Sequence, residues 1–149
     1  MKIGISAPSM PRSGAIVAGV LDGGELGATA QRLDKATSGA IQSGIKASRF
    51  NGAAGQTLSL VAPAGVGASR IVLVGLGKPE KFDDLAAQSV GGAIVALLEK
   101  SGEKTVMVAA DPVKGSKLKP AEIAANMAYG ALLRSYSFDK YRTTLKPNQ

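Results

Sequence analysis

Short apolar or alternating runs, most of them followed by glycine or proline, indicate β-strands in this chain. Residues 2–6 and 57–61 alternate polar and apolar side chains, and residues 15–20 are mostly apolar. Residues 71–74 and 105–110 form nearly unbroken apolar runs, which are typical of strands covered on both faces. We therefore expect five strands.

The apolar spacing changes to that of an amphipathic helix in three segments. The first predicted helix spans residues 34–47, and the Asp34 carboxylate is placed to cap its first turn. The second begins at Asp83 or Asp84 and carries an apolar stripe. The third starts at Pro120, because proline suits the first position of a helix. Its expected inner side consists of Ile123, Ala124, Met127, Ala128, Ala131 and Leu132.

Two adjacent glycines, Gly91 and Gly92, lie inside the second predicted helix. Each costs about 1 kcal/mol in helix propensity relative to alanine. Glycine is retained inside a helix where another element approaches its backbone closely. We therefore predict close packing of this helix against the sheet, with little tolerance for bulk.

The alternation of strands and helices after residue 34 predicts a three-layer α/β/α domain with a mixed, mostly parallel sheet. The length of 149 residues and the hydrophobic content of 45% fit one compact domain. No period of about 20 to 50 residues repeats along the chain, which argues against a solenoid or a propeller.

Residue types that commonly carry catalysis are scarce. The sequence contains no His and no Cys, so it offers no imidazole, no thiolate and no disulfide framework. The adjacent Asp83 and Asp84 fit helix capping better than metal binding. The GLGK segment at residues 75–78 lacks the spacing of a phosphate loop, and a strand-ending turn explains it better. Neither a secretory signal nor a membrane-spanning stretch is evident, so we expect a cytoplasmic protein without membrane contact.

The net charge of +7 is concentrated late in the chain. Residues 1–111 carry eleven Lys or Arg against nine carboxylates, whereas residues 112–149 carry seven against two. The late residues of interest are a basic group, Lys114, Lys117 and Lys119, and three aromatic residues among the basic residues of the tail, Tyr136, Phe138 and Tyr141. Together they suit a phosphate-contacting surface. A solvated loop and an aromatic segment that packs against another domain explain them better.

Five segments carry a resemblance by their order and spacing. They are LDKATSGAI (residues 33–41), FNGAAGQ (50–56), RIVLVGLGK (70–78), the pair Gly91 and Gly92, and YGALLRSYSFDKYRT (129–143). In this order they resemble the N-terminal domain of the M17 leucine aminopeptidase family, whose members are also called cytosol or leucyl aminopeptidases. The resemblance covers essentially the whole chain but only the first domain of that family.

The resemblance implies a fold similar to macro domains over residues 1–134, and a linker over residues 135–149 that leads to a larger catalytic domain. In such enzymes the catalytic domain holds two divalent metal ions, zinc or manganese, on lysine, aspartate and glutamate side chains. Its signature, Asn-Thr-Asp-Ala-Glu-Gly-Arg, does not occur in this sequence. No catalytic, cofactor-binding or metal-ligating residue is therefore assigned here, and we expect the chain alone to be inert as a peptidase.

The resemblance also implies partners. They are the catalytic domain of the same polypeptide, which we expect Tyr136, Phe138 and Tyr141 to contact, and the other subunits of a hexamer. The expected role of the chain is to support the assembly and regulation of an enzyme that removes N-terminal residues from peptides.

A second hypothesis is an independent module that binds nucleic acid or ADP-ribose, since macro domains can bind ADP-ribose and some family members bind DNA. The basic group at Lys114, Lys117 and Lys119 would contact the phosphates. Asp22 is the nearest acidic candidate for an adenine pocket, but no aromatic residue precedes Phe50, and a turn is its simpler interpretation. Fold resemblance by itself establishes neither activity.

Overall fold

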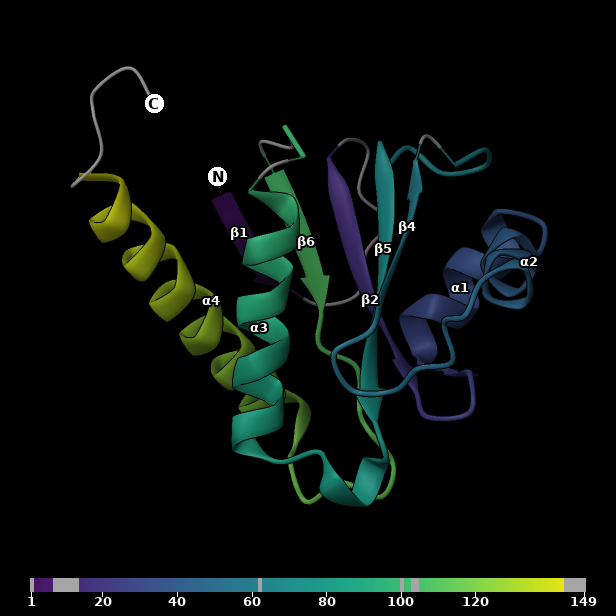
Figure 1. Cartoon of the computed structure of the whole chain (residues 1–149). Coiled ribbons are helices and arrows are strands. Elements are labelled where there is room, and N and C mark those ends of the chain that lie inside the picture. Colours follow the sequence, from purple (N-terminus) through teal and green to yellow (C-terminus); the bar gives the residue numbers. More distant parts are fainter. Residues whose placement is uncertain (1, 7–13, 62, 100, 103–104, 144–149) are drawn as a thin grey trace.

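The chain folds as three layers, with one sheet between two pairs of helices (Figure 1). The computed structural model describes residues 2–6, 14–61, 63–99, 101–102 and 105–143, and for 2–6 and 136–143 the backbone alone. The strands are β1 (Lys2–Ser6), β2 (Ala15–Leu21), β3 (Glu25–Leu26), β4 (Thr57–Val61), β5 (Arg70–Gly77) and β6 (Thr105–Ala109). The helices are α1 (Ala28–Ala36), α2 (Ala40–Ala47), α3 (Asp84–Leu98) and α4 (Pro120–Thr143), with a 3-10 turn, η1 (Pro79–Lys81). The predicted α/β/α layering is confirmed.

The sheet is mixed and mostly parallel, as predicted. Its main strand order is β1-β6-β2-β5-β4. The pairs β1–β6, β6–β2 and β2–β5 are parallel, whereas β4 is antiparallel to β5 and the short β3 is antiparallel to β2. The carboxyl ends of β6, β2 and β5 therefore meet at one edge of the sheet.

Alternate residues of the central strands supply two separate cores. In β2, Ile16 packs on the side of α1 and α2, whereas Val17 packs on the side of α3 and α4. In β5, Leu73 and Val74 divide in the same way. Both strands are apolar at nearly every position because each face of the sheet is covered by helices.

The helix predicted over residues 34–47 is wrong in its bounds, because two helices occupy this region. The chain reverses between them at Ser38 and Gly39, which have φ values of 56° and 88°. Glycine adopts this left-handed conformation readily, so Gly39 permits the break that apolar spacing does not reveal. The Asp34 carboxylate does cap a first turn, but that of α2: its Oδ1 accepts a hydrogen bond from the Gln42 amide at 2.9 Å.

Helix α3 begins where the sequence predicted. The Asp83 carboxylate accepts a hydrogen bond from the Ala86 amide at 2.9 Å and caps the helix. The apolar stripe predicted for α3 is confirmed, because Val90, Ile94 and Leu98 are buried. This stripe faces the sheet in the core shared with β2, β5 and β6.

The close packing predicted for Gly91 is present, but its partner is α4 and not the sheet. A Cβ atom on Gly91 would lie 2.0 Å from the carbonyl oxygen of Met127, and one on Gly130 would lie 1.9 Å from the carbonyl oxygen of Gln88. Gly92 has more room, since its nearest neighbour would be 3.7 Å away. The backbones of α3 and α4 therefore touch at Gly91 and Gly130.

The predicted inner side of α4 is only partly right. Ile123, Met127 and Ala131 are buried, whereas Ala128 and Leu132 are exposed. The helix carries apolar residues on both sides, so their spacing does not reveal which side packs. The contact at Gly130 sets the rotation of α4 about its axis.

The backbone of α4 continues to Thr143, and so through much of the linker predicted over residues 135–149. Residues 144–149 lie outside the described residues. The boundary between residues 134 and 135 stays a prediction. Within the described part of the chain, no helix is long and apolar enough to cross a membrane.

Candidate functional site

The carboxyl ends of β2, β5 and β6 border a crevice at the edge of the sheet where open α/β folds commonly bind ligands. Its lining includes Gly19, Gly27, Leu76, Asp111 and Met127. The space within it is only about 20 Å³. A single water molecule needs about 10 to 15 Å³, so the crevice has room for about one water molecule and not for a larger ligand.

The Asp111 carboxylate occupies the N-terminus of α1, beside this crevice. Its Oδ2 accepts a hydrogen bond from the Thr29 amide at 2.9 Å, and its Oδ1 accepts one from the Thr29 hydroxyl at 2.8 Å. Gly27 at the start of the helix donates its own amide to the Gly19 carbonyl at 3.1 Å. Helix N-termini bind anions through backbone amides that have no acceptor within the helix. Here a side chain of the protein already takes the place of an external anion.

Sequence reasoning missed Asp111. The available signal was an acidic residue shortly after a buried strand, which is where ligand-contacting residues of α/β folds often lie. Its partner lies 82 residues earlier in the chain, so the pairing depends on the order of strands in the sheet.

Asp22, the acidic residue considered for an adenine pocket, lies in an exposed turn. Its backbone amide donates to the Gly77 carbonyl at 3.0 Å, and its side chain does not line the crevice. The interpretation of Asp22 as a turn residue agrees with this position.

The GLGK segment at residues 75–78 is the end of a strand. The Gly75 amide donates to the Gln56 carbonyl at 2.8 Å, and the Gly77 amide donates to the Gly52 carbonyl at 2.9 Å. Both amides are therefore satisfied within the protein and do not face a phosphate. The loop that begins at Gly52 closes over this strand end.

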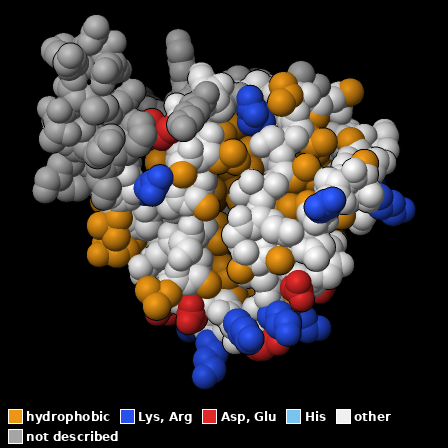
Figure 2. Space-filling view, in the orientation of Figure 1, with side chains coloured by type: hydrophobic (Ala, Val, Ile, Leu, Met, Phe, Trp, Pro, Cys, Tyr) orange, Lys and Arg blue, Asp and Glu red, His pale blue; other side chains and the backbone are white. Residues whose placement is uncertain are grey.

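Lys114, Lys117 and Lys119 are exposed on the loop before α4. The Ser116 hydroxyl of this loop donates to the Phe82 carbonyl at 2.6 Å, which ties the loop to the segment after η1. The contact brings further charged residues to the same end of the molecule, where Figure 2 shows Lys and Arg mixed with Asp and Glu. The added residues are the lysines Lys78 and Lys81 and the carboxylates Glu80, Asp83, Asp84 and Glu122.

Two of these four carboxylates are there as helix caps. Asp83 caps α3, and Glu122 Oε1 accepts a hydrogen bond from the Lys119 amide at 2.9 Å at the start of α4. Asp84 accepts a hydrogen bond from the Asn126 amide group at 2.7 Å, which joins the two helix starts. Five exposed lysines thus share their surface with four carboxylates, so the positive field there is weak.

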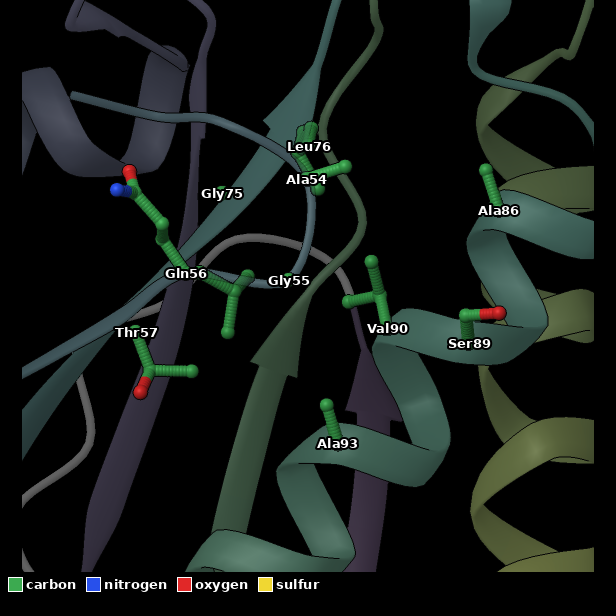
Figure 3. A pocket seen from close by; sticks show the side chains of 11 residues that line it. Ala54, Gly55, Gln56, Thr57, Gly75, Leu76, Ala86, Ser89, Val90 and Ala93 are labelled. Carbon is green, nitrogen blue, oxygen red and sulfur yellow. The ribbon is translucent and has the colours of Figure 1, made fainter. Parts of the chain in front are cut away.

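An apolar hollow lies on the α3 side of the sheet edge, between α3 and the loop before β4 (Figure 3). It encloses about 180 Å³. Figure 3 shows Ala86, Val90 and Ala93 of α3 on one side and Ala54 and Leu76 on the other. Its complete lining is Ala54, Gly55, Gln56, Thr57, Val74, Gly75, Leu76, Ala86, Ser89, Val90 and Ala93. Its polar side chains are those of Gln56, Thr57 and Ser89, and none of the lining side chains is charged.

Within the described residues, no group of three or more Asp, Glu, His or Cys side chains is placed to hold a metal ion. The aromatic residues expected at a domain contact, Tyr136, Phe138 and Tyr141, lie on the backbone of α4, and their side chains fall outside the described residues. That expectation stays a prediction.

Two probable cytosol aminopeptidases match this chain along nearly all of its length. A probable cytosol aminopeptidase of Chelativorans sp. is 37% identical over 138 residues, which are 93% of this chain and 27% of that protein. A probable cytosol aminopeptidase of Rhodopseudomonas palustris is 32% identical over 149 residues, which are 100% of this chain and 29% of that protein. The chain thus spans less than a third of the length of these relatives.

Solved structures agree in fold. A mutant of tomato leucine aminopeptidase superposes with a TM-score of 0.73 at 24% identity, over 91% of this chain and 28% of that one. The macrodomain of Mycobacterium tuberculosis DarG superposes with a TM-score of 0.64 at 12% identity, over 89% of this chain and 91% of that one. The macro-domain-like fold expected from the sequence is therefore confirmed. The family model for the N-terminal domain of the cytosol aminopeptidase family matches residues 17–145, so the chain belongs to that family as its N-terminal domain.

Proposed function

We propose that this chain acts as the non-catalytic N-terminal domain of a leucyl aminopeptidase, a two-metal exopeptidase that removes N-terminal residues from peptides. Its role is to support assembly and regulation of the enzyme, which works as a hexamer in the cytoplasm. The observation that carries the proposal is the family match over residues 17–145, together with relatives that are more than three times as long.

The chemistry belongs to the catalytic domain in this proposal. In that domain, lysine, aspartate and glutamate side chains would hold two divalent ions, zinc or manganese, which would supply an activated water for hydrolysis. The family match to an N-terminal domain and the greater length of the relatives support this division of labour.

The test compares this chain with a longer polypeptide. The longer one joins Gln149 to the part of the Rhodopseudomonas palustris relative that follows its matched segment, because that match covers 100% of this chain. We expect the 149-residue chain with Mn²⁺ or Zn²⁺ to leave leucine amide intact, and the longer polypeptide to hydrolyse it in a chelator-sensitive way. Chelator-sensitive hydrolysis by the purified short chain would overturn the proposal, as would an inactive longer polypeptide.

The assembly role needs a separate control. The control is the catalytic part expressed without this chain. The masses of this control and of the longer polypeptide are measured by light scattering. We expect a hexamer for the longer polypeptide and smaller species for the catalytic part alone. If the catalytic part alone forms the same oligomer as the longer polypeptide, this chain has no role in assembly.

The second candidate, a module that binds ADP-ribose or nucleic acid, is favoured only by the likeness in fold to a macrodomain. The crevice of about 20 Å³ and the carboxylate of Asp111 at the α1 N-terminus argue against a nucleotide there. Calorimetric titration with ADP-ribose and with duplex DNA at two salt concentrations decides between the candidates. Saturable binding, weakened steeply by salt in the case of DNA, would favour the module.

A further inference from the structure

Helix α4 presents a second apolar side to the exterior. Its inner side is buried against α3, with Ile123 at 0% and Met127 at 4% exposure. On the opposite side Tyr129 is 52%, Leu132 is 68% and Leu133 is 48% exposed. We call this second side the outer face of α4, and it comprises Ala125, Ala128, Tyr129, Leu132 and Leu133. Figure 2 shows apolar side chains at the left edge of the molecule, over α4.

The outer face has the spacing and composition of a packing surface. Positions 125, 128, 129 and 132 follow the i, i+3, i+4, i+7 pattern of one helix side. The eleven residues from 123 to 133 include no charged side chain. Their one strongly polar side chain, Asn126, is bonded to Asp84 and Gln88 of α3. A helix that is apolar on both sides is typical of one buried on both sides.

The connection of α4 to the rest of the enzyme identifies what covers this face. Helix α4 follows the other described elements and runs to Thr143. The relatives are more than three times as long, and this chain matches their N-terminal domain up to residue 145, so the rest of their sequence follows the segment that corresponds to α4. A directly connected domain meets the outer face at high effective concentration.

We infer that the outer face of α4 is the surface that docks the catalytic domain of the same polypeptide. This inference rests on the proposed function and adds to it a defined surface, which lies before the tail residues expected to make the domain contact. In sequence, Tyr136 is seven residues after Tyr129 and four after Leu132, so it continues the same spacing.

The absence of cysteine from this chain allows a direct test. Leu132→Cys introduces a single thiol into the chain at a position that is 68% exposed. Leu85→Cys is the matched control, because Leu85 is 71% exposed but lies on α3. Each substitution is made in the 149-residue chain and in the longer polypeptide described above. The rate of maleimide reaction is measured by mass spectrometry of the peptide that carries the introduced thiol.

We expect the thiol of Leu132→Cys to react about tenfold or more slowly in the longer polypeptide than in the 149-residue chain, and the thiol of Leu85→Cys to react equally in both. Tyr129→Cys, on the same face, should repeat the result for position 132. Equal rates at positions 129 and 132 in both proteins would overturn the inference, even if the longer polypeptide hydrolyses leucine amide. If the longer polypeptide is inactive but the thiol at position 132 is still protected, the result counts against the proposed function. The docking surface is retained in that case.

A second copy of the chain is the rival occupant of this face. In that case the thiol at position 132 would be protected in the 149-residue chain at high concentration and would become reactive on dilution. Protection of that kind, with no further protection in the longer polypeptide, would also overturn the inference.

Discussion

The carboxylate of Asp111 holds both the backbone amide and the side-chain hydroxyl of Thr29, at 2.9 and 2.8 Å. The two residues lie 82 positions apart, one after β6 and the other at the start of α1. Asp111 therefore joins the carboxyl edge of the sheet to the helical layer that contains α1 and α2. The Asp111 carboxylate also accepts the hydrogen bond of the Thr29 amide, which an anionic ligand at the N-terminus of α1 would otherwise accept.

Replacement of this carboxylate should destabilise the fold. Thr29 is only 4% exposed. Asp111→Ala leaves the Thr29 amide and hydroxyl without their acceptor, so we expect a loss of about 1 to 3 kcal/mol in the free energy of unfolding. Urea denaturation followed by circular dichroism measures the change. Asp22→Ala, in an exposed turn, is the control and should stay within about 0.5 kcal/mol. An equal effect of the two substitutions would contradict a structural role for Asp111.

The contact between α3 and α4 makes opposite predictions for two neighbouring glycines. Gly91→Ala places a methyl group 2.0 Å from the Met127 carbonyl oxygen, so the helices must separate, and we expect a loss of about 1 to 3 kcal/mol. Gly92→Ala meets its nearest atom at 3.7 Å and should gain up to about 1 kcal/mol from helix propensity. Thermal unfolding of the two variants compares them directly. Equal tolerance at both positions would show that the helices do not touch at Gly91.

The cap that Asp34 provides for α2 is the basis of a third test. Asp34→Ala removes the acceptor of the Gln42 amide and should cost about 0.5 to 1 kcal/mol. Asp34→Asn keeps an oxygen acceptor and should cost less. Amide hydrogen exchange at Gln42 reports the cap locally, and exchange unchanged in Asp34→Ala would exclude it.

The hollow beside α3 should accept added volume. Ala93→Leu directs methyl groups into the space of about 180 Å³, and we expect a gain of about 0.5 to 1 kcal/mol in stability. Ala87→Leu, at a residue with 0% exposure on the same helix, is the matched control and should lose about 1 to 3 kcal/mol. The midpoints of urea unfolding separate the two outcomes. Destabilisation by Ala93→Leu would mean that the hollow is not open to a side chain.

Local patterns in the amino-acid sequence were sufficient for the layers of the fold. The unbroken apolar run at residues 71–74 indicated a strand covered on both faces, and β5 is buried between β2 and β4. The stripe of α3 and its cap at Asp83 were also local features, because a helix repeats every 3.6 residues and its cap lies within one turn. The order of short sequence segments along the chain likewise indicated the family.

Backbone conformation at a break in one helix and contacts between distant segments decided the rest. Apolar spacing joined residues 34–47 into one helix, but the left-handed conformation at Ser38 and Gly39 divides it. The spacing in α4 fitted either side, and only the close approach of Gly130 to Gln88 selected the buried one. The pairing of Asp111 with Thr29 required β6 to lie beside β2. Periodicity reports that a side chain is apolar, whereas the packing partner of that side chain depends on where the chain returns in space.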